Sequence, residues 1–130
     1  MKIIIQNSSD MPIYQQIYEQ IKEVILSGSI SDGELLPSIR QLSRELKVSV
    51  ITTTRAYTDL ENDGYITIVQ GKGCYVKPIN QNMLEEKLLH SIEEHFSEIL
   101  KCAKLLKKSD EELSQLLKTL MEESYYDRNQ

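Results

Sequence analysis

The segment from Leu36 to Val76 constrains the fold of this chain more than any other part of its 130 residues. The spacing of its apolar and turn residues predicts two short helices joined by a tight turn, followed by a β-hairpin with glycines at its tip. A winged helix-turn-helix needs this order of elements to enter a groove of DNA. No other segment indicates a chemistry as directly.

A first amphipathic helix is predicted upstream, over about residues 11–27, where apolar residues recur at helical spacing before the stop at Gly28. Pro37 then suits the first turn of a short second helix, because proline lacks the N–H that this turn leaves unpaired. The apolar face of the second helix consists of Ile39, Leu42 and Leu46. Arg40 and Arg44 share a more exposed face of the same helix.

A third helix is predicted from Ser49, a suitable N-cap, to about Asn62. Its inward residues would be Thr53, Ala56, Tyr57 and Leu60, and its outer side would carry Val50, Ile51, Thr54 and Thr58. The β-branched and aromatic runs at residues 65–69 and 74–77 flank Gln70-Gly71-Lys72-Gly73 and predict a hairpin. Two glycines at the tip permit close approach of the backbone to another surface.

The composition changes to Leu, Glu, Lys and Ser after Asn80 and predicts two further helices. The first would begin at a capping box of Asn82 and Glu85, and the second at a capping box of Ser109 and Glu112. The apolar stripe of the first consists of Leu84, Leu88, Ile92, Phe96, Ile99, Ala103 and Leu106. Because so thin a hairpin cannot bury its stripes alone, they must cover the first domain or a second subunit, and homodimerisation is the better explanation.

These patterns predict a mainly α fold with a small β-hairpin wing. Residues 1–78 would form a winged helix-turn-helix domain that binds DNA. Residues 79–130 would form a C-terminal two-helix dimerisation hairpin.

The distribution of charge favours DNA binding more than the net charge of −5 does. Residues 1–78 hold eight Lys and Arg against nine Asp and Glu, whereas residues 79–130 hold seven against eleven. Most of the excess negative charge is therefore C-terminal. Between residues 36 and 58 only Glu45 opposes the basic side chains of Arg40, Arg44, Lys47 and Arg55. A small basic footprint on an acidic protein suits specific DNA binding and suppresses non-specific binding.

The sequence lacks the residue patterns that indicate a disulfide framework, a metal site, an enzyme or a membrane protein. Cys74 and Cys102 have no CxxC spacing and no histidine at ligand spacing, so free thiols are expected rather than a disulfide or a zinc site. His90 and His95 lie off the spacing that places two metal ligands on one helical face. No GxSxG and no phosphate-binding loop is present, so no catalytic site, cofactor or metal is expected. The lack of a signal-peptide core or a long apolar run predicts a cytoplasmic protein with no membrane contact.

Three motifs in this sequence together resemble the N-terminal domain of GntR-family transcriptional regulators. They are the LPSIRQLSRELKVS run, the TRAYTDLENDGYI run and the QGKGCYV wing. The preceding PIYQQIYEQIKEVILSG resembles that family's first helix, so the resemblance spans residues 10–78 without a gap. The triplet from Arg55 to Tyr57 and the short helical C-terminal region look most like the YtrA-type subfamily.

The resemblance implies a homodimeric repressor on an inverted-repeat operator of double-stranded DNA, with the third helix in the major groove and the wing at the minor groove. The matching positions are Ser38 and Arg40 at the start of the second helix, Ser49, Val50, Ile51, Thr52 and Thr54 at the reading end of the third, Arg55 as a phosphate clamp, and Gly71 and Lys72 at the wing tip. The half-sites would lie about 10 base pairs apart or a multiple of that. YtrA-type regulators are often associated with transporter operons, and a small-molecule effector could bind between the subunits or be dispensable.

Alternatives remain open for individual residues and for the function. Val50 and Ile51 stand where relatives often carry polar side chains, so we hypothesise that they contact thymine methyl groups of an A·T-containing half-site. Arg40 and Arg44 could instead form a solvated face that pairs with nearby glutamates. The competing function is a winged-helix module for protein interaction without DNA binding, which the acidic surface and the two apolar residues would support.

Overall fold

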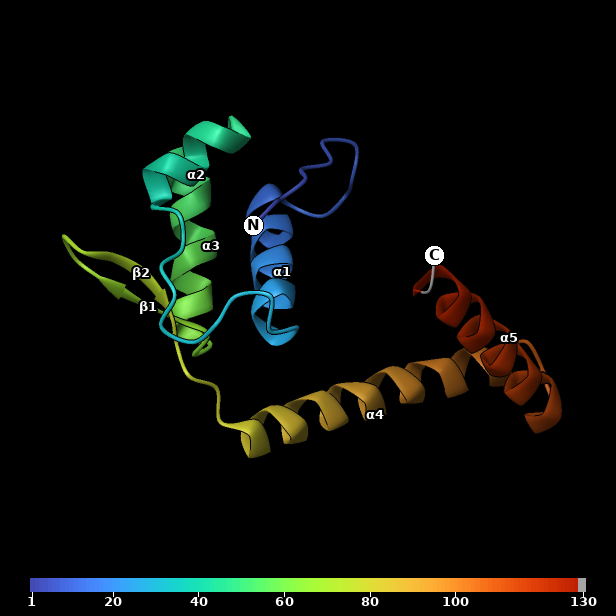
Figure 1. The fold of residues 1–130 in the computed structure, drawn as a ribbon. Coiled ribbons are helices and arrows are strands. Elements are labelled where there is room, and N and C mark those ends of the chain that lie inside the picture. The colour runs from blue at the N-terminus through green and yellow to red at the C-terminus, as the bar shows by residue number, and fades with distance from the viewer. Residues whose placement is uncertain (129–130) are drawn as a thin grey trace. The chain divides into compact units, whose positions relative to one another are not determined.

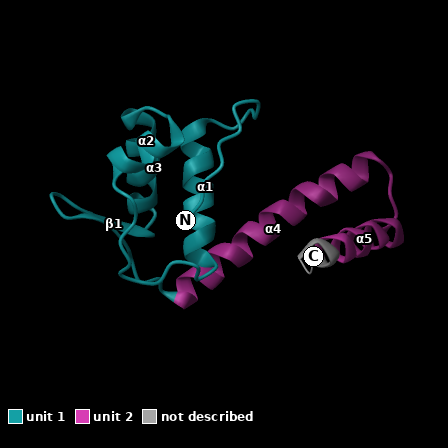
Figure 2. Ribbon diagram, turned by 45° about the horizontal axis from the view of Figure 1, so that its top comes forward, with its two compact units in different colours: residues 1–80 teal, residues 81–130 magenta. Residues whose placement is uncertain are grey.

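The computed structural model describes residues 1–128, with the side chains of residues 125–128 left out of that description. The elements, in chain order, are α1 (Ile13–Leu26), α2 (Ile39–Leu46), α3 (Val50–Asn62), β1 (Ile66–Val69), β2 (Gly73–Val76), α4 (Gln81–Leu105) and α5 (Asp110–Arg128) (Figure 1). The predicted order of elements and the mainly helical fold with one small hairpin are confirmed. The chain divides into two compact units, residues 1–80 and residues 81–130 (Figure 2).

Two hydrogen bonds between Ser43 and Val48 close the turn between α2 and α3. Lys47 ends α2 in the left-handed conformation with φ 56°, which allows the amide of Val48 to donate to the carbonyl of Ser43 at 3.1 Å. The hydroxyl of Ser43 donates in return to the carbonyl of Val48 at 2.5 Å. These two bonds fix the conformation of the turn and thereby the position of the start of α3 relative to α2.

Helix α3 has the inner and outer faces that its sequence predicts. The hydroxyl of Ser49 accepts a hydrogen bond from the amide of Thr52 at 3.0 Å and caps the helix. The buried residues of α3 are Thr53, Ala56, Tyr57 and Leu60, as predicted. Because Thr53 is a polar residue in the core, its hydroxyl donates to the carbonyl of Ser49 at 3.2 Å and is satisfied within the helix.

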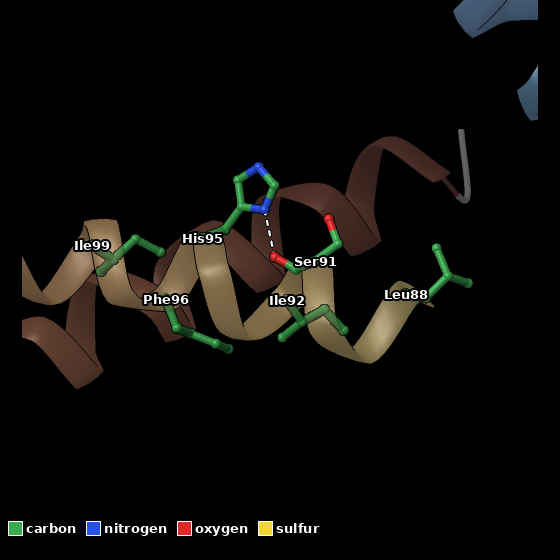
Figure 3. Close-up of a pocket in the computed structure, with 6 residues that line it drawn as sticks. All are labelled: Leu88, Ser91, Ile92, His95, Phe96 and Ile99. Atoms are coloured by element: carbon green, nitrogen blue, oxygen red, sulfur yellow. Dashed lines mark hydrogen bonds between the residues drawn. The ribbon is translucent and has the colours of Figure 1, made fainter. Parts of the chain in front are cut away.

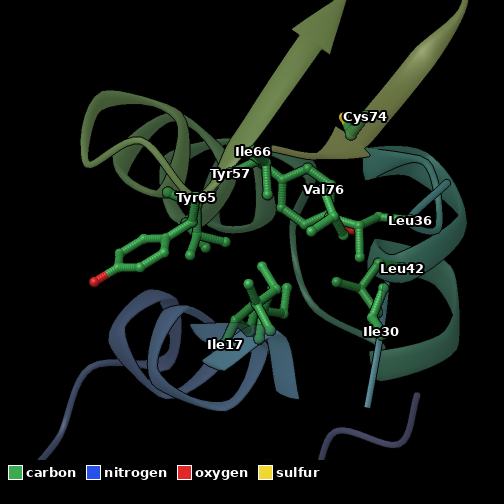
Figure 4. Packing of buried hydrophobic residues seen from close by; sticks show 13 residues of the cluster. Ile17, Ile30, Leu36, Leu42, Tyr57, Tyr65, Ile66, Cys74 and Val76 are labelled. Atoms are coloured by element: carbon green, nitrogen blue, oxygen red, sulfur yellow. The ribbon is translucent and has the colours of Figure 1, made fainter. Parts of the chain in front are cut away.

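The core of the N-terminal unit joins α1, α2, α3 and the hairpin (Figure 4). Fully buried side chains come from α1, α3 and both strands, and the largest are Tyr57, Ile17, Ile21, Leu60, Ile66 and Val76. The hydroxyl of Tyr57 donates to the carbonyl of Pro37 at 2.7 Å, directly before the Ser38 cap of α2. One side chain thus connects the middle of α3 to the start of α2, and burial raises its pKa far above the usual value for tyrosine.

The hairpin has hydrogen-bond partners on both of its outer edges. Its strands pair antiparallel, with Ile66 opposite Val76 and Val69 opposite Gly73. Beside β2, the amide of Leu36 donates to the carbonyl of Cys74 at 2.8 Å. Beside β1, the amide of Ile68 donates to the carboxylate of Glu61 at 2.7 Å, so the end of α3 holds the hairpin by a charge-assisted hydrogen bond.

The C-terminal unit consists of α4 and α5. Helix α4 begins at Gln81, so Asn82 lies inside the first turn and the predicted cap at Asn82 is wrong. The second predicted capping box is confirmed, because Ser109 and Glu112 exchange two hydrogen bonds of 3.2 Å at the start of α5. The hydrogen bonds from Ser109 and the nearby Lys108 lower the pKa of the Glu112 carboxyl. Within residues 1–128, no helix is both long and apolar enough to cross a bilayer.

The hydrogen bond from Tyr57 predicts a measurable loss of stability in Tyr57→Phe. Removing the hydroxyl leaves the carbonyl of Pro37 without its partner and should lower the free energy of unfolding by about 1–3 kcal/mol. Denaturant unfolding followed by circular dichroism measures this loss.

Tyr75→Phe is the matched control, because the Tyr75 hydroxyl bonds to the carbonyl of Lys72 at 3.1 Å at an exposed position. Its loss should be within about 0.5 kcal/mol. Equal losses in the two variants would contradict the role given to Tyr57.

Candidate nucleic-acid interface

The first turn of α3 presents its hydroxyls in a fixed arrangement. The hydroxyl of Ser49 accepts from the amide of Thr52 and donates to the hydroxyl of Thr52 at 2.8 Å. The hydroxyl of Ser49 is therefore occupied by the helix itself. Thr52 receives that hydrogen bond and keeps its own O–H to donate to an outside acceptor.

Apolar side chains dominate the exposed part of the same helix end. Ile51 is 83% exposed and Val50 is 47% exposed, whereas a β-branched apolar residue is usually buried. Thr54 is also exposed on α3. The exposed side chains of Val50, Ile51 and Thr54 thus offer methyl groups and a hydroxyl, and none of them carries an amide or a guanidinium that could read a base edge.

The start of α2 carries Ser38 and Arg40. The hydroxyl of Ser38 accepts from the amide of Gln41 at 3.0 Å, so Ser38 is the N-cap of this helix. Arg40 is exposed, and among the side chains that the structure describes it forms no ion pair. The side chain of Glu45 instead accepts from the Gln41 amide at 3.1 Å. The exposed guanidinium of Arg40 is accordingly available to an anion.

Arg55 is exposed on α3 and lies over an aromatic ring of α1. Its guanidinium carbon is 3.7 Å from the centre of the Tyr14 ring, which is the distance of a close cation–π contact. The sequence predicted a phosphate clamp at Arg55 and did not predict a role for Tyr14. No spacing rule links these two residues, because the contact depends on how α1 packs against α3.

The wing tip carries Gly71 and Lys72, both exposed. The backbone of Lys72 is used within the turn, where its amide donates to the carbonyl of Val69 at 2.9 Å. Gly71 has φ 80°, which favours glycine, although a Cβ placed there would meet no atom within 4 Å. The close approach of the backbone occurs instead at Gly73, where a Cβ would come within 2.8 Å of the Leu35 side chain.

The ten predicted DNA-binding residues therefore lie at three places in the N-terminal unit: the start of α2, the first two turns of α3, and the wing tip. Among these ten, the side-chain hydrogen bonds that the structure gives join only Ser49 and Thr52 to each other. The cationic side chains of Arg40, Arg55 and Lys72 come from α2, from α3 and from the turn between β1 and β2.

Other kinds of site are not assembled in the described part of the chain. Residues 1–128 contain no group of three or more His, Cys, Asp or Glu placed to hold a metal. Cys74 is a buried free thiol whose pKa is raised by burial and by the nearby Glu61, and Cys102 is an exposed free thiol. On α4, His90 lies 2.9 Å from Glu94, and His95 bonds to the carbonyl of Ser91 at 2.6 Å.

Comparison with known proteins places the N-terminal unit in a family. The family described as "Bacterial regulatory proteins, gntR family" matches residues 13–76. The chain is 34% identical over 98 residues to the HTH-type transcriptional repressor YtrA of Bacillus subtilis, and this match covers 75% of each protein.

Two solved structures extend the comparison to the fold and to DNA. A GntR family transcriptional regulator from Listeria monocytogenes has 29% identity and a TM-score of 0.69, over 88% of this chain and 98% of that one. The DNA-binding domain of AraR, solved in complex with operator ORX1, has 29% identity and a TM-score of 0.53, over 58% of this chain and 95% of that one.

Proposed function

This chain belongs to the GntR family of bacterial regulatory proteins and is a DNA-binding transcriptional regulator, not an enzyme, and we propose that it acts as a homodimeric repressor on a palindromic operator. The related YtrA of Bacillus subtilis is named a transcriptional repressor, which supports repression as the mode of action. The AraR domain was solved with its operator, which supports a similar mode of docking for the N-terminal unit. A transporter operon is the class of target that we propose, and the cytoplasm is the proposed location.

One observation carries the proposed mode of DNA binding: exposed cations stand at the start of α2, on α3 and at the wing tip, and the first turn of α3 leaves Val50 and Ile51 exposed. Arg40, Arg55 and Lys72 are all exposed, and no carboxylate described in the structure pairs with them. Unpaired cations at these places are suited to phosphate groups, which position a protein on the duplex. The exposed residues of α3 would then face the base edges in the major groove.

We expect the affinity for a random-sequence duplex to fall steeply with salt, because each neutralised phosphate contributes about 0.9 to the slope of log K against log salt. Arg40→Ala should weaken binding by about 1–3 kcal/mol and lower the slope by about one. Fluorescence anisotropy over a salt series measures both quantities.

Arg44→Ala is the matched control, because it removes the same charge from the same helix outside the Ser38–Arg40 start of α2. It should change affinity less than Arg40→Ala does. A flat salt response of the unaltered protein would overturn DNA binding and favour the winged-helix module for protein interaction.

The exposed apolar side chains at the start of α3 support an A·T-containing half-site. Ile51 can neither donate nor accept a hydrogen bond, whereas the C5-methyl group of thymine is an apolar feature of the major groove. Burying one methyl group from water contributes about 0.8 kcal/mol, or about fourfold in affinity. We therefore propose that Ile51, with Val50 beside it, selects thymine by contact with its methyl group.

A thymine-to-deoxyuridine exchange tests this contact, because it removes only the methyl group. An operator selected from genomic fragments with the purified protein supplies the duplex. One such exchange per half-site should weaken binding about fourfold per site, and the effect should vanish in Ile51→Ala. If no exchange weakens binding, or if Ile51→Ala is equally sensitive, the proposed contact is wrong.

The C-terminal unit supports a dimer through its uncovered apolar side chains. Along α4, apolar residues recur at helical spacing and are each about half exposed, namely Leu88, Ile92, Phe96 and Ile99 (Figure 3). Leu116, Leu117 and Leu120 of α5 are exposed to a similar degree. A face of this kind is usually covered in a soluble protein, and we propose that a second copy covers it through the same residues. Residues 79–130 are thus the proposed dimerisation region.

Phe96→Glu in the full-length chain should disrupt this dimer, because burying an unpaired carboxylate costs about 3 kcal/mol or more. The dissociation constant should rise about 100-fold or more, as measured by sedimentation equilibrium. Lys101→Glu is the control, because it changes charge on the same helix at an exposed ion pair with Glu98. A dimer that tolerates Phe96→Glu as well as Lys101→Glu would exclude this face as the interface.

A further inference from the structure

We propose that Tyr14 of α1 is a positioning residue that holds the guanidinium of Arg55 for a DNA phosphate. This inference rests on the DNA-binding function proposed above. It adds a residue outside the helix-turn-helix to the interface, on a helix for which the sequence predicts no DNA contact. The observation behind it is the 3.7 Å separation between the guanidinium carbon of Arg55 and the centre of the Tyr14 ring.

A guanidinium carbon 3.7 Å from the ring centre lies over the face of the ring, and this position leaves the hydrogen-bonding capacity of Arg55 free. The N–H donors of a guanidinium lie in its plane and point outward, whereas the aromatic ring contacts its face. Among the side chains that the structure describes, no carboxylate lies within ion-pair distance of Arg55. The aromatic ring therefore orients the guanidinium of Arg55, while the N–H donors of the guanidinium stay available to an anion. Two adjacent N–H donors fit two phosphate oxygens.

The ring of Tyr14 is itself held in place by contacts at the start of α1. Tyr14 is half-buried and packs against the core of the N-terminal unit. The buried side-chain amide of Gln16 donates to the carbonyls of Met11 and Gln6, at 2.8 and 3.0 Å, and accepts from the amide of Gln6 at 2.8 Å. These bonds connect residues 6–11, which form a turn, to the first turns of α1. The backbone that carries Tyr14 is therefore held by hydrogen bonds before it, at Met11, and after it, at Gln16.

Positioning by stacking has an energetic consequence for binding. A free arginine side chain samples many rotamers and loses that freedom when it grips a phosphate. Stacking on Tyr14 restricts the side chain before DNA arrives, so less entropy is lost on binding. The cation–π contact at an exposed site corresponds to about a two- to fivefold effect on an equilibrium.

The test compares Tyr14→Phe, which keeps the ring, with Tyr14→Leu and Tyr14→Met, which remove it while keeping an apolar side chain. All variants are full-length, and binding to a random-sequence duplex is measured over a salt series. Tyr14→Leu and Tyr14→Met should weaken binding about two- to fivefold and lower the salt slope by up to about one. Tyr14→Phe should bind as the unaltered protein does.

A double-mutant cycle separates positioning from a general effect on the fold. Tyr14→Leu should have no further effect in an Arg55→Ala background, because Tyr14 acts through Arg55. Tyr18→Leu, one turn later on α1, is the control: Tyr18 bonds to Asp63, and among the cation–π contacts of the described residues its ring pairs with Lys22 and not with Arg55, so its loss should leave the salt slope unchanged. Thermal unfolding of each variant identifies any that fails to fold, and Tyr14→Met serves where Tyr14→Leu does not fold.

Additive effects of Tyr14→Leu and Arg55→Ala would overturn the inference, and so would equal weakening by Tyr14→Phe and Tyr14→Leu. A salt-independent affinity of the unaltered protein would instead overturn DNA binding itself. The two failures are distinguishable because the second appears without any variant.

Discussion

The burial of Tyr57 is the constraint on which the N-terminal unit depends. Its ring lies in the core with no exposed surface, and its hydroxyl donates to the carbonyl of Pro37. A buried hydroxyl without a partner would be destabilising, so this ring can occupy the core only where a carbonyl is within reach. The carbonyl belongs to the residue before the cap of α2, and the same contact therefore sets α2 against α3. The position of the reading helix follows from a bond in the core.

The wing depends on a second polar contact at the other end of α3. A two-stranded hairpin is marginal by itself in water, because it has two open edges and little core. Here Leu36 bonds to β2, and the Glu61 carboxylate accepts from the Ile68 amide of β1. Glu61 is thus a negative charge within the DNA-binding unit that has a structural use. This use helps to explain how a domain with nearly balanced charge can still present exposed cations at the start of α2, on α3 and at the wing tip.

The candidate interface combines residues with two different kinds of role. Ser38 and Ser49 match family positions for DNA contact, yet their hydroxyls cap α2 and α3. Arg40, Arg55 and Lys72 have no carboxylate partner among the described residues and are exposed. The serines set where each helix begins, whereas the cations are free to reach an anion. Ile51 is exposed and has no polar group, so its contribution to binding depends on whether it contacts an apolar group, such as a thymine methyl, in the groove.

The sequence alone determined the local elements of this protein, because caps, turns and apolar periodicity act over a few residues. Interactions of this short range predict the boundaries of α3 and its buried side. They also predict the capping box of Ser109 and Glu112. The cap of α4 was misplaced because Asn82 lies two residues after Asn80, which directly precedes the helix, and helix ends are the least constrained part of such a pattern. Only the tertiary structure decided that Tyr57 reaches Pro37, that Glu61 holds the wing, and that Tyr14 lies beneath Arg55. The contacts of Tyr57 and Tyr14 join residues far apart in the chain, whereas the contact of Glu61 crosses the short connection from α3 to β1. All three geometries exist only after the helices and the hairpin have packed around one core.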